Sequence, residues 1–142
     1  MASAQKFNSF VEYLAEKVIN TETDTFKVML VNTAPVSTNT VKADLTEISA
    51  GNGYSAGGNT ASVSSSAQSS GTFKLVLADP ATWTASGGSI GPFRYAVLYD
   101  DTPTSPADPL VLFWDYGSAV TLAAGETFTV DFDATNGVLQ IA

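Results

Sequence analysis

Two apolar, aromatic runs constrain the fold of this chain more than any other feature. They cover residues 93–100 (FRYAVLYD) and 109–116 (PLVLFWDY), and the connection between them contains Pro103 and Pro106. Runs of this length and content predict β-strands, and the prolines exclude a helix between them. By alternation, one face of the first run carries Phe93, Tyr95, Val97 and Tyr99. In the second run both faces are apolar, which predicts a central strand that is covered on both sides.

Weaker strand patterns occupy much of the remaining chain. Alternation of apolar and polar residues predicts further strands at 25–31, 60–64, 73–78 and 127–133. Asn136-Gly137 is a hairpin signal, which we expect to return the chain into a last strand at 138–141. The serine-rich residues 65–71 are expected to form a flexible loop. The glycine-rich residues 51–58 predict tight turns, with Tyr54 as a packing anchor.

A single amphipathic helix is predicted over residues 5–18. Its apolar positions recur at helical spacing and are Phe7, Phe10, Val11, Leu14, Ala15 and Val18. Asn20 is expected to end the helix. A helix of this length is marginal in water on its own, so it must pack on another surface. That surface is either its own domain or a neighbouring subunit.

These elements define the expected fold class. One helix, seven to nine short strands and no internal repeat favour a mainly β protein, either an antiparallel β-sandwich or a jelly-roll-like barrel with one N-terminal amphipathic α-helix. A length of 142 residues suits one domain. We expect residues 1–22 to form the helix and a linker, and residues 23–142 to form a single β domain.

Composition argues against most enzyme classes. The chain contains no cysteine and no histidine, so it lacks a thiolate metal site, the usual zinc ligands and the usual general base. No phosphate-loop motif is present in the glycine-rich segment, because the Lys-Ser/Thr ending is missing. We therefore expect a protein that is not an enzyme and holds no cofactor.

Charge narrows the classes of partner. The net charge is −8 with only six basic residues, which argues against nucleic-acid binding, since that needs Lys and Arg to displace phosphate counterions. Residues 75–142 carry Arg94 alone against eight acids. This acidic half is either a solvated face or a surface that docks on a basic partner or holds a cation. No signal-peptide pattern and no apolar run of ~20 residues is present, so we expect no membrane partner.

Paired carboxylates are the remaining chemical candidates. Asp100-Asp101 is expected to cap a turn, while Asp131 and Asp133 share a face opposite the aromatic core and are expected to be exposed. Calcium is the one metal with any support, because Asp100, Asp101 and Asp108 lie in loops that could supply carboxylates and carbonyls. No calcium-loop motif is present among them.

Arg94 is the only arginine and lies in the most apolar part of the chain. Its guanidinium is expected to pair with Asp115 on the adjacent strand or to stack on an aromatic ring. The alternative is an anchor in an interface, where arginine is enriched.

Several short motifs follow one another across nearly the whole chain. After the N-terminal amphipathic helix come TDTFKVML at 23–30, GNGYSAGG at 51–58, RYAVLYDD at 94–101, PLV at 109–111 and WDYG at 114–117. This order resembles a family of small structural proteins of tailed-phage virions. The resemblance implies a capsid decoration or cement protein that binds the assembled shell of the major capsid protein and stabilises it. It implies no catalytic residues.

The resemblance also implies a location, and we hypothesise a set of contact residues for this role from the residues themselves. The expected location is the capsid surface of the virion, after assembly in the host cytoplasm, and the expected state is a homo-oligomer on the capsid. The candidate interface residues are Phe7, Phe10, Leu14, Arg94, Asp100, Asp101 and Asp108. The alternative function is a host-surface or carbohydrate-binding module of a tail or fibre, in which exposed Tyr54, Trp83 and Trp114 stack on sugars.

Overall fold

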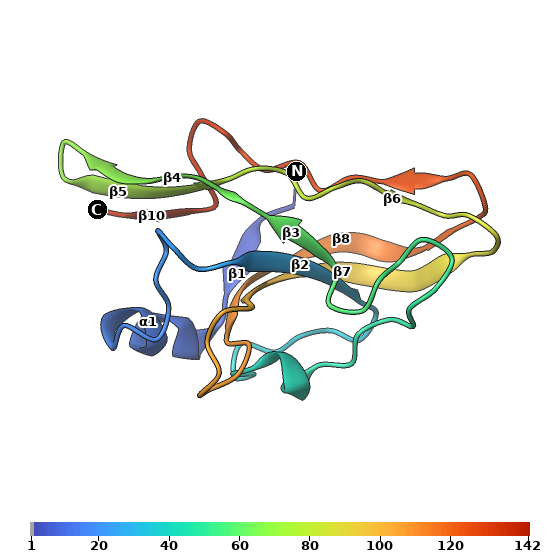
Figure 1. Cartoon of the computed structure of the whole chain (residues 1–142), viewed down its shortest axis with the longest axis horizontal. Helices are drawn as coiled ribbons and strands as arrows, with labels where there is room; N and C mark the ends of the chain where they lie inside the picture. The colour runs from blue at the N-terminus through green and yellow to red at the C-terminus, as the bar shows by residue number, and fades with distance from the viewer. Residues whose placement is uncertain (1) are drawn as a thin grey trace.

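The chain folds into two layers of antiparallel β-sheet. The computed structural model describes residues 2–142, and it confirms the predicted class: mainly β, with one α-helix near the N-terminus, consistent with a β-sandwich. Figure 1 shows the larger sheet below and two smaller sheets side by side above it, with the helix at one end.

The larger sheet has five strands in the order β1-β8-β7-β2-β3. Their bounds are β1 (Ala4–Lys6), β8 (Leu110–Leu122), β7 (Ile90–Asp100), β2 (Phe26–Val31) and β3 (Asn59–Ala61). The two aromatic runs of the sequence are β7 and β8, which pair along most of their length. The predicted central strand is confirmed, because residues 110–113 of β8 are all buried and contact clusters on both faces of the sheet.

The upper layer consists of two smaller sheets. One has the order β10-β5-β4, and the other is the ribbon β6-β9. Their bounds are β4 (Val63–Ser69), β5 (Thr72–Leu77), β6 (Trp83–Thr84), β9 (Thr127–Phe128) and β10 (Leu139–Ile141). The helix α1 covers Asn8–Ala15, and a short 3₁₀ turn, η1, covers Lys42–Asp44.

Two hydrophobic clusters occupy the two faces of the larger sheet. Strand β2 contributes to both, because its successive side chains point to opposite faces. Val28 and Leu30 belong to the larger cluster, which also contains Trp83 and Leu75 of the upper layer. Met29 and Val31 belong to the smaller cluster with the buried Phe7, Tyr99 and Phe113. The sheet is therefore covered by apolar side chains on both sides.

The first aromatic run does not keep a regular alternation. The β7–β8 register shifts on both sides of Phe93, and Gly91 in the same stretch has a φ of +117°. Phe93 consequently joins the larger cluster with Leu98, whereas Val97 and Tyr99 join the smaller one. The prediction that Phe93 shares a face with Val97 was wrong, because a β-bulge reverses the facing of every residue beyond it.

The helix is shorter than predicted. Residues 4–6 form β1, which pairs with β8, and α1 ends at Ala15. Lys17 then adopts a φ of +62°, and the amides of residues 18 and 19 both donate to Tyr13 O. The resulting turn directs Ile19 into the larger cluster. Within the helix Val11 is 51% exposed, contrary to the expected apolar face. Phe10 and Ile19 both pack within the chain's own core.

Two loop predictions were also wrong. The serine-rich residues 65–69 are part of β4, which pairs with β5 through a two-residue turn at Ser70-Gly71. Both turn residues have positive φ, +51° and +83°, as a type I′ hairpin turn requires. Asn136-Gly137 does not close a hairpin with residues 127–133, because β10 pairs with β5 instead. The Asp133 carboxylate accepts hydrogen bonds from the amides of residues 135 and 136, and this turn redirects the chain toward β5.

Candidate functional site

The glycine-rich segment is an internal support. The Tyr54 hydroxyl donates to Glu47 Oε1 at 2.6 Å and accepts from Leu30 N at 3.0 Å. Glu47 Oε1 also accepts from Gly57 N at 2.6 Å, and Gly57 O accepts from the buried Tyr99 hydroxyl at 2.7 Å. Burial, with the Glu47 hydrogen bond, raises the pKa of the Tyr54 hydroxyl, so it stays neutral. Tyr54 is therefore the packing anchor that the sequence predicted.

Two of the three aromatic residues proposed to stack on sugars lie in the interior. Tyr54 is 2% exposed and Trp83 is 1% exposed, and their rings stack with centroids 6.3 Å apart. The expectation that they are exposed was wrong, because β6 turns Trp83 into the core between the layers. Trp114 alone remains partly accessible.

The seven candidate interface residues are dispersed over the fold. Phe7 and Phe10 are enclosed in different clusters on opposite faces of the larger sheet, so their side chains are not surface contacts in this structure. Leu14 and Asp108 are half-buried. Asp101 is exposed and forms an ion pair with Lys27 at 3.0 Å. The structure does not bring these residues together on one surface.

Asp100 is fully buried at the end of β7. Its Oδ1 accepts a hydrogen bond from Thr102 N at 3.0 Å, while its Oδ2 has no hydrogen-bond partner within residues 2–142. Burial raises the pKa of Asp100 to about 8, and contact with the Asp24 carboxyl adds to the shift. Desolvation of this carboxyl group therefore favours its neutral, protonated form over the carboxylate.

The predicted calcium ligands do not form a coordination sphere in the part of the chain that the structure describes. Asp101 binds Lys27, and residues 2–142 contain no group of three or more His, Cys, Asp or Glu side chains that could hold a metal ion.

Arg94 is paired with Asp115, as the sequence predicted. Arg94 Nε lies 2.7 Å from Asp115 Oδ1, and Nη2 lies 2.9 Å from Oδ2, which is a bidentate contact. The guanidinium also lies over the Tyr95 ring, 5.4 Å from its centroid. The Arg94 hydrogen bond and the Gly117 amide lower the pKa of Asp115. The Arg94 guanidinium thus contacts both a carboxylate and an aromatic ring, and the Asp115 carboxylate neutralises its charge.

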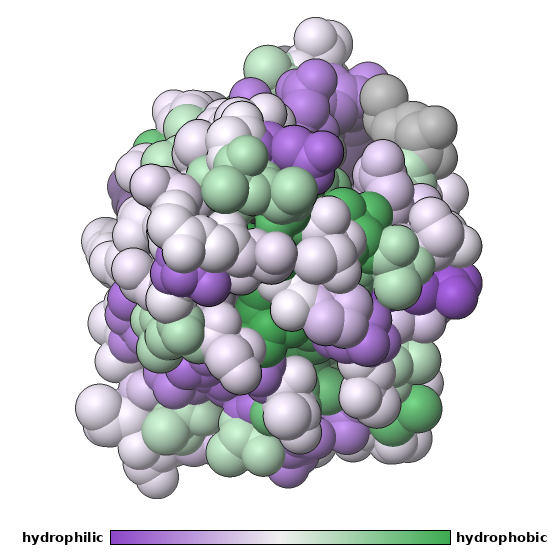
Figure 2. All heavy atoms as spheres, turned by 90° about the vertical axis from the view of Figure 1, so that its right-hand side faces the viewer, coloured by the Kyte–Doolittle hydropathy of each residue, from purple (hydrophilic) through white to green (hydrophobic). Residues whose placement is uncertain are grey.

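An apolar groove of 340 Å³ runs beside this ion pair, between the larger sheet and the C-terminal segment. Its walls include Trp114 and Tyr116 from β8, Arg94 from β7, and residues 128–133 from the segment that crosses above. Tyr116 is 58% exposed and its ring meets Phe128 edge to face at 5.7 Å. Figure 2 views the molecule from the right-hand side of Figure 1, and on that face apolar atoms lie recessed among paler and polar residues.

The rim of this groove is acidic. Asp131 and Asp133 line it and are exposed, and the one basic lining residue, Arg94, is already bound to Asp115. Strands β7 and β8 were predictable from their own residues. No sequence signal indicated that 128–133 lies over them, because that depends on the turn at Asp133.

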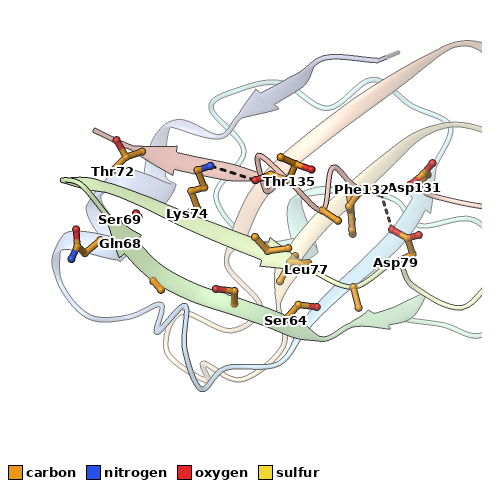
Figure 3. Close-up of a pocket in the computed structure, with 15 residues that line it drawn as sticks. Ser64, Gln68, Ser69, Thr72, Lys74, Leu77, Asp79, Asp131, Phe132 and Thr135 are labelled. Carbon is orange, nitrogen blue, oxygen red and sulfur yellow. Dashed lines mark hydrogen bonds between the residues drawn. The ribbon is translucent and has the colours of Figure 1, made fainter.

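A second, more open hollow of 720 Å³ lies on the outer face of the β4–β5 hairpin. Residues of β4 and β5, several of them serine or threonine, line one side of it, and residues from the 131–135 segment form one wall. Figure 3 shows Lys74 directed to Thr135, where Nζ donates to the carbonyl at 3.4 Å. Asp79 Oδ1 accepts from Phe132 N at 2.8 Å. These two hydrogen bonds connect the wall to strand β5 and to the loop that follows it.

Two further findings concern the whole chain. Within residues 2–142, no helix is long and apolar enough to cross a membrane. Comparison with protein-family models, curated proteins and solved structures finds no match to this chain.

Proposed function

We propose that the chain is a non-enzymatic virion structural protein, a capsid decoration or cement protein that binds the assembled shell of the major capsid protein. The observation that carries the proposal is the groove beside Arg94 and Asp115. It combines apolar and aromatic walls with the exposed carboxylates of Asp131 and Asp133. Such a surface fits a segment that is apolar and basic, because apolar burial supplies affinity and opposite charge directs docking.

The occupant of the groove is then a Lys- or Arg-containing apolar segment of the capsid protein. Arg94 does not repel such a segment, because Asp115 neutralises it. Tyr116 and Trp114 supply the large contact surfaces that usually dominate interface energies. A protein that binds only the assembled shell stabilises that shell by mass action.

The resemblance of the motif order to small virion proteins supports the same function. We accordingly propose the capsid surface of the virion as its location, after assembly in the host cytoplasm, with neither nucleic acid nor membrane as a partner. Among the candidate interface residues, Arg94 lines the groove, whereas Asp101 and Asp108 lie on the separate loop after β7.

Co-sedimentation with shells of the major capsid protein tests the proposal. The wild-type chain should sediment with assembled shells and stay in solution with unassembled subunits. Tyr116→Ser and Asp131→Lys should each weaken binding by about tenfold or more, since each removes part of the apolar or acidic contact. Val36→Ser is the control for Tyr116→Ser, because Val36 is another exposed apolar residue, 55% accessible, and does not line the groove.

Failure to sediment with shells, or equal binding to shells and free subunits, would contradict the decoration function. If shells bind the chain but Tyr116→Ser and Val36→Ser behave alike, the function stands and the groove is not the contact.

The alternative is a carbohydrate-binding module of a tail or fibre. The surface that supports it is the same groove, where Trp114 and Tyr116 are the accessible rings. A glycan array together with immunogold localisation on shell or tail separates the two functions. Glycan binding that Tyr116→Ser abolishes, with label on the tail, would favour the alternative.

A further inference from the structure

The open edge of β4 is the one long strand edge of the upper layer without a neighbour. In the sheet order β10-β5-β4, β4 is an outer strand of seven residues, and it pairs only with β5 among the strands in residues 2–142. The opposite outer strand, β10, has only three residues. A long outer strand presents unpaired backbone amides and carbonyls that can pair with another chain.

The register identifies which residues present these groups. The two-residue turn closes on the pair Ser69 and Thr72, so Ser69, Ala67 and Ser65 direct their backbone groups to β5. Their neighbours Ser66 and Gln68 therefore direct their amides and carbonyls to the open edge. No hydrogen bond within residues 2–142 occupies these groups; the nearby Thr21 reaches only the Ser66 side chain, with the two hydroxyl oxygens 3.2 Å apart.

This edge lacks most of the features that usually prevent edge-to-edge pairing. Natural edges are protected by charged side chains, proline, bulges or short length. The sequence of β4 is VSSSAQS, with no charged residue and no proline, and the register shift between Val63 and Ser65 lies at its far end. The stretch 48–73 contains no charged residue at all. In a chain of net charge −8, a second copy meets the least repulsion here.

We propose that two copies of the chain associate by antiparallel pairing of β4 with β4 of the second copy. Under a two-fold axis each outward amide faces a carbonyl of the partner, so one edge is complementary to itself. The result is a continuous six-stranded sheet across the dimer, in the order β10-β5-β4 followed by the partner's β4-β5-β10. The small side chains of β4 leave the second strand free to approach. This association is independent of what the groove binds.

A pair of matched substitutions tests the dimer. Proline is tolerated in an edge strand where its nitrogen faces solvent, but it removes the outward amide and blocks close approach of a second strand. Ser66→Pro should convert the dimer to a monomer, whereas Ser66→Ala should leave the dimer intact. Both variants lose the hydroxyl contact with Thr21, so that contact cancels in the comparison. Gln68→Pro and Gln68→Ala form a second pair in case Ser66→Pro does not fold.

The measurements are sedimentation velocity of the full chain over a dilution series and hydrogen exchange of the same samples. We expect a dimer whose Ser66 and Gln68 amides are protected, and we expect both amides to exchange quickly after dilution to monomer. A wild-type chain that stays monomeric throughout the series overturns the proposal. A dimer that persists in a folded proline variant, or whose Ser66 and Gln68 amides exchange freely, overturns it as well.

Discussion

At the residue scale, the groups that looked chemically active in the sequence are mostly bound within the fold. Arg94 is held by Asp115, and Glu47 is held by the Tyr54 hydroxyl and the Gly57 amide. Asp100 is the exception, because it is buried next to another carboxyl group and has one oxygen without a partner in residues 2–142. The least satisfied acid in the chain is thus an internal residue, remote from the groove.

Asp100 makes stability depend on pH in a defined direction. Burial and the Asp24 contact raise its pKa from the ordinary value of 3.8 to about 8 in the folded chain. Between these values the folded state binds the proton that the unfolded state has lost, so the Asp100 contribution to stability declines as pH rises from about 4 to about 8. Asp100→Asn keeps the site neutral at every pH, and its amide oxygen can still accept the hydrogen bond from Thr102 N. We expect it to increase the free energy of unfolding near pH 8 by a few kcal/mol, because the folded wild-type chain must keep this carboxyl group protonated or bury its charge.

Urea unfolding of both proteins at several pH values between 4 and 9 measures this effect. The difference between Asp100→Asn and wild type should grow with pH and then level off above about pH 8. Asp131→Asn, at an exposed position, should show no such growth. A constant difference over the whole range would mean that Asp100 does not hold the proton.

At the element scale, the strongly apolar strands were predictable from the sequence. The prediction failed for elements whose conformation depends on tertiary contacts. The strands β2, β5, β7 and β8 were identified because their alternation or their aromatic content is strong. The serine-rich strand β4 was missed, since only its pairing with β5 makes it a strand. The useful signal was the dipeptide Ser70-Gly71, which adopts the positive φ values of a hairpin turn. The groove was not predictable, because its walls come from elements far apart in the chain.

The facing of α1 provides a test at this scale. Helical spacing alone assigned Phe10 and Val11 to the same apolar face, whereas Phe10 is 1% exposed and Val11 is 51% exposed. Phe10→Ala should reduce the free energy of unfolding by about 3–5 kcal/mol, because it leaves a cavity in the core. Val11→Ala should change it by less than about 0.5 kcal/mol. Chemical denaturation of the two variants measures both changes in the free energy of unfolding. Equal changes would mean that Phe10 and Val11 share one buried face, as helical spacing alone predicts.

At the whole-molecule scale, charge separates two surfaces with different roles. The groove lies in the acidic half, where residues 75–142 carry eight acids and only Arg94, whereas the open edge of β4 lies in the charge-free stretch 48–73. Docking on a basic capsid segment gains from opposite charges. Association of two copies must overcome repulsion between two chains of net charge −8. The same property therefore assists one interaction and opposes the other.

Salt should consequently change the two interactions in opposite directions. The Debye length falls from about 10 Å at 0.1 M to about 3 Å at 1 M, so added salt weakens both attraction to the capsid and repulsion between copies. We expect binding to shells to weaken as sodium chloride is raised, while the β4 dimer becomes tighter. Co-sedimentation and sedimentation velocity at matched salt concentrations measure the two trends.

The variant Ser66→Pro separates shell binding from dimer formation, because it removes the dimer and leaves the groove unaltered. If its binding to shells keeps the wild-type salt dependence, the two surfaces act independently; if shell binding of wild type is insensitive to salt, the acidic rim does not direct docking.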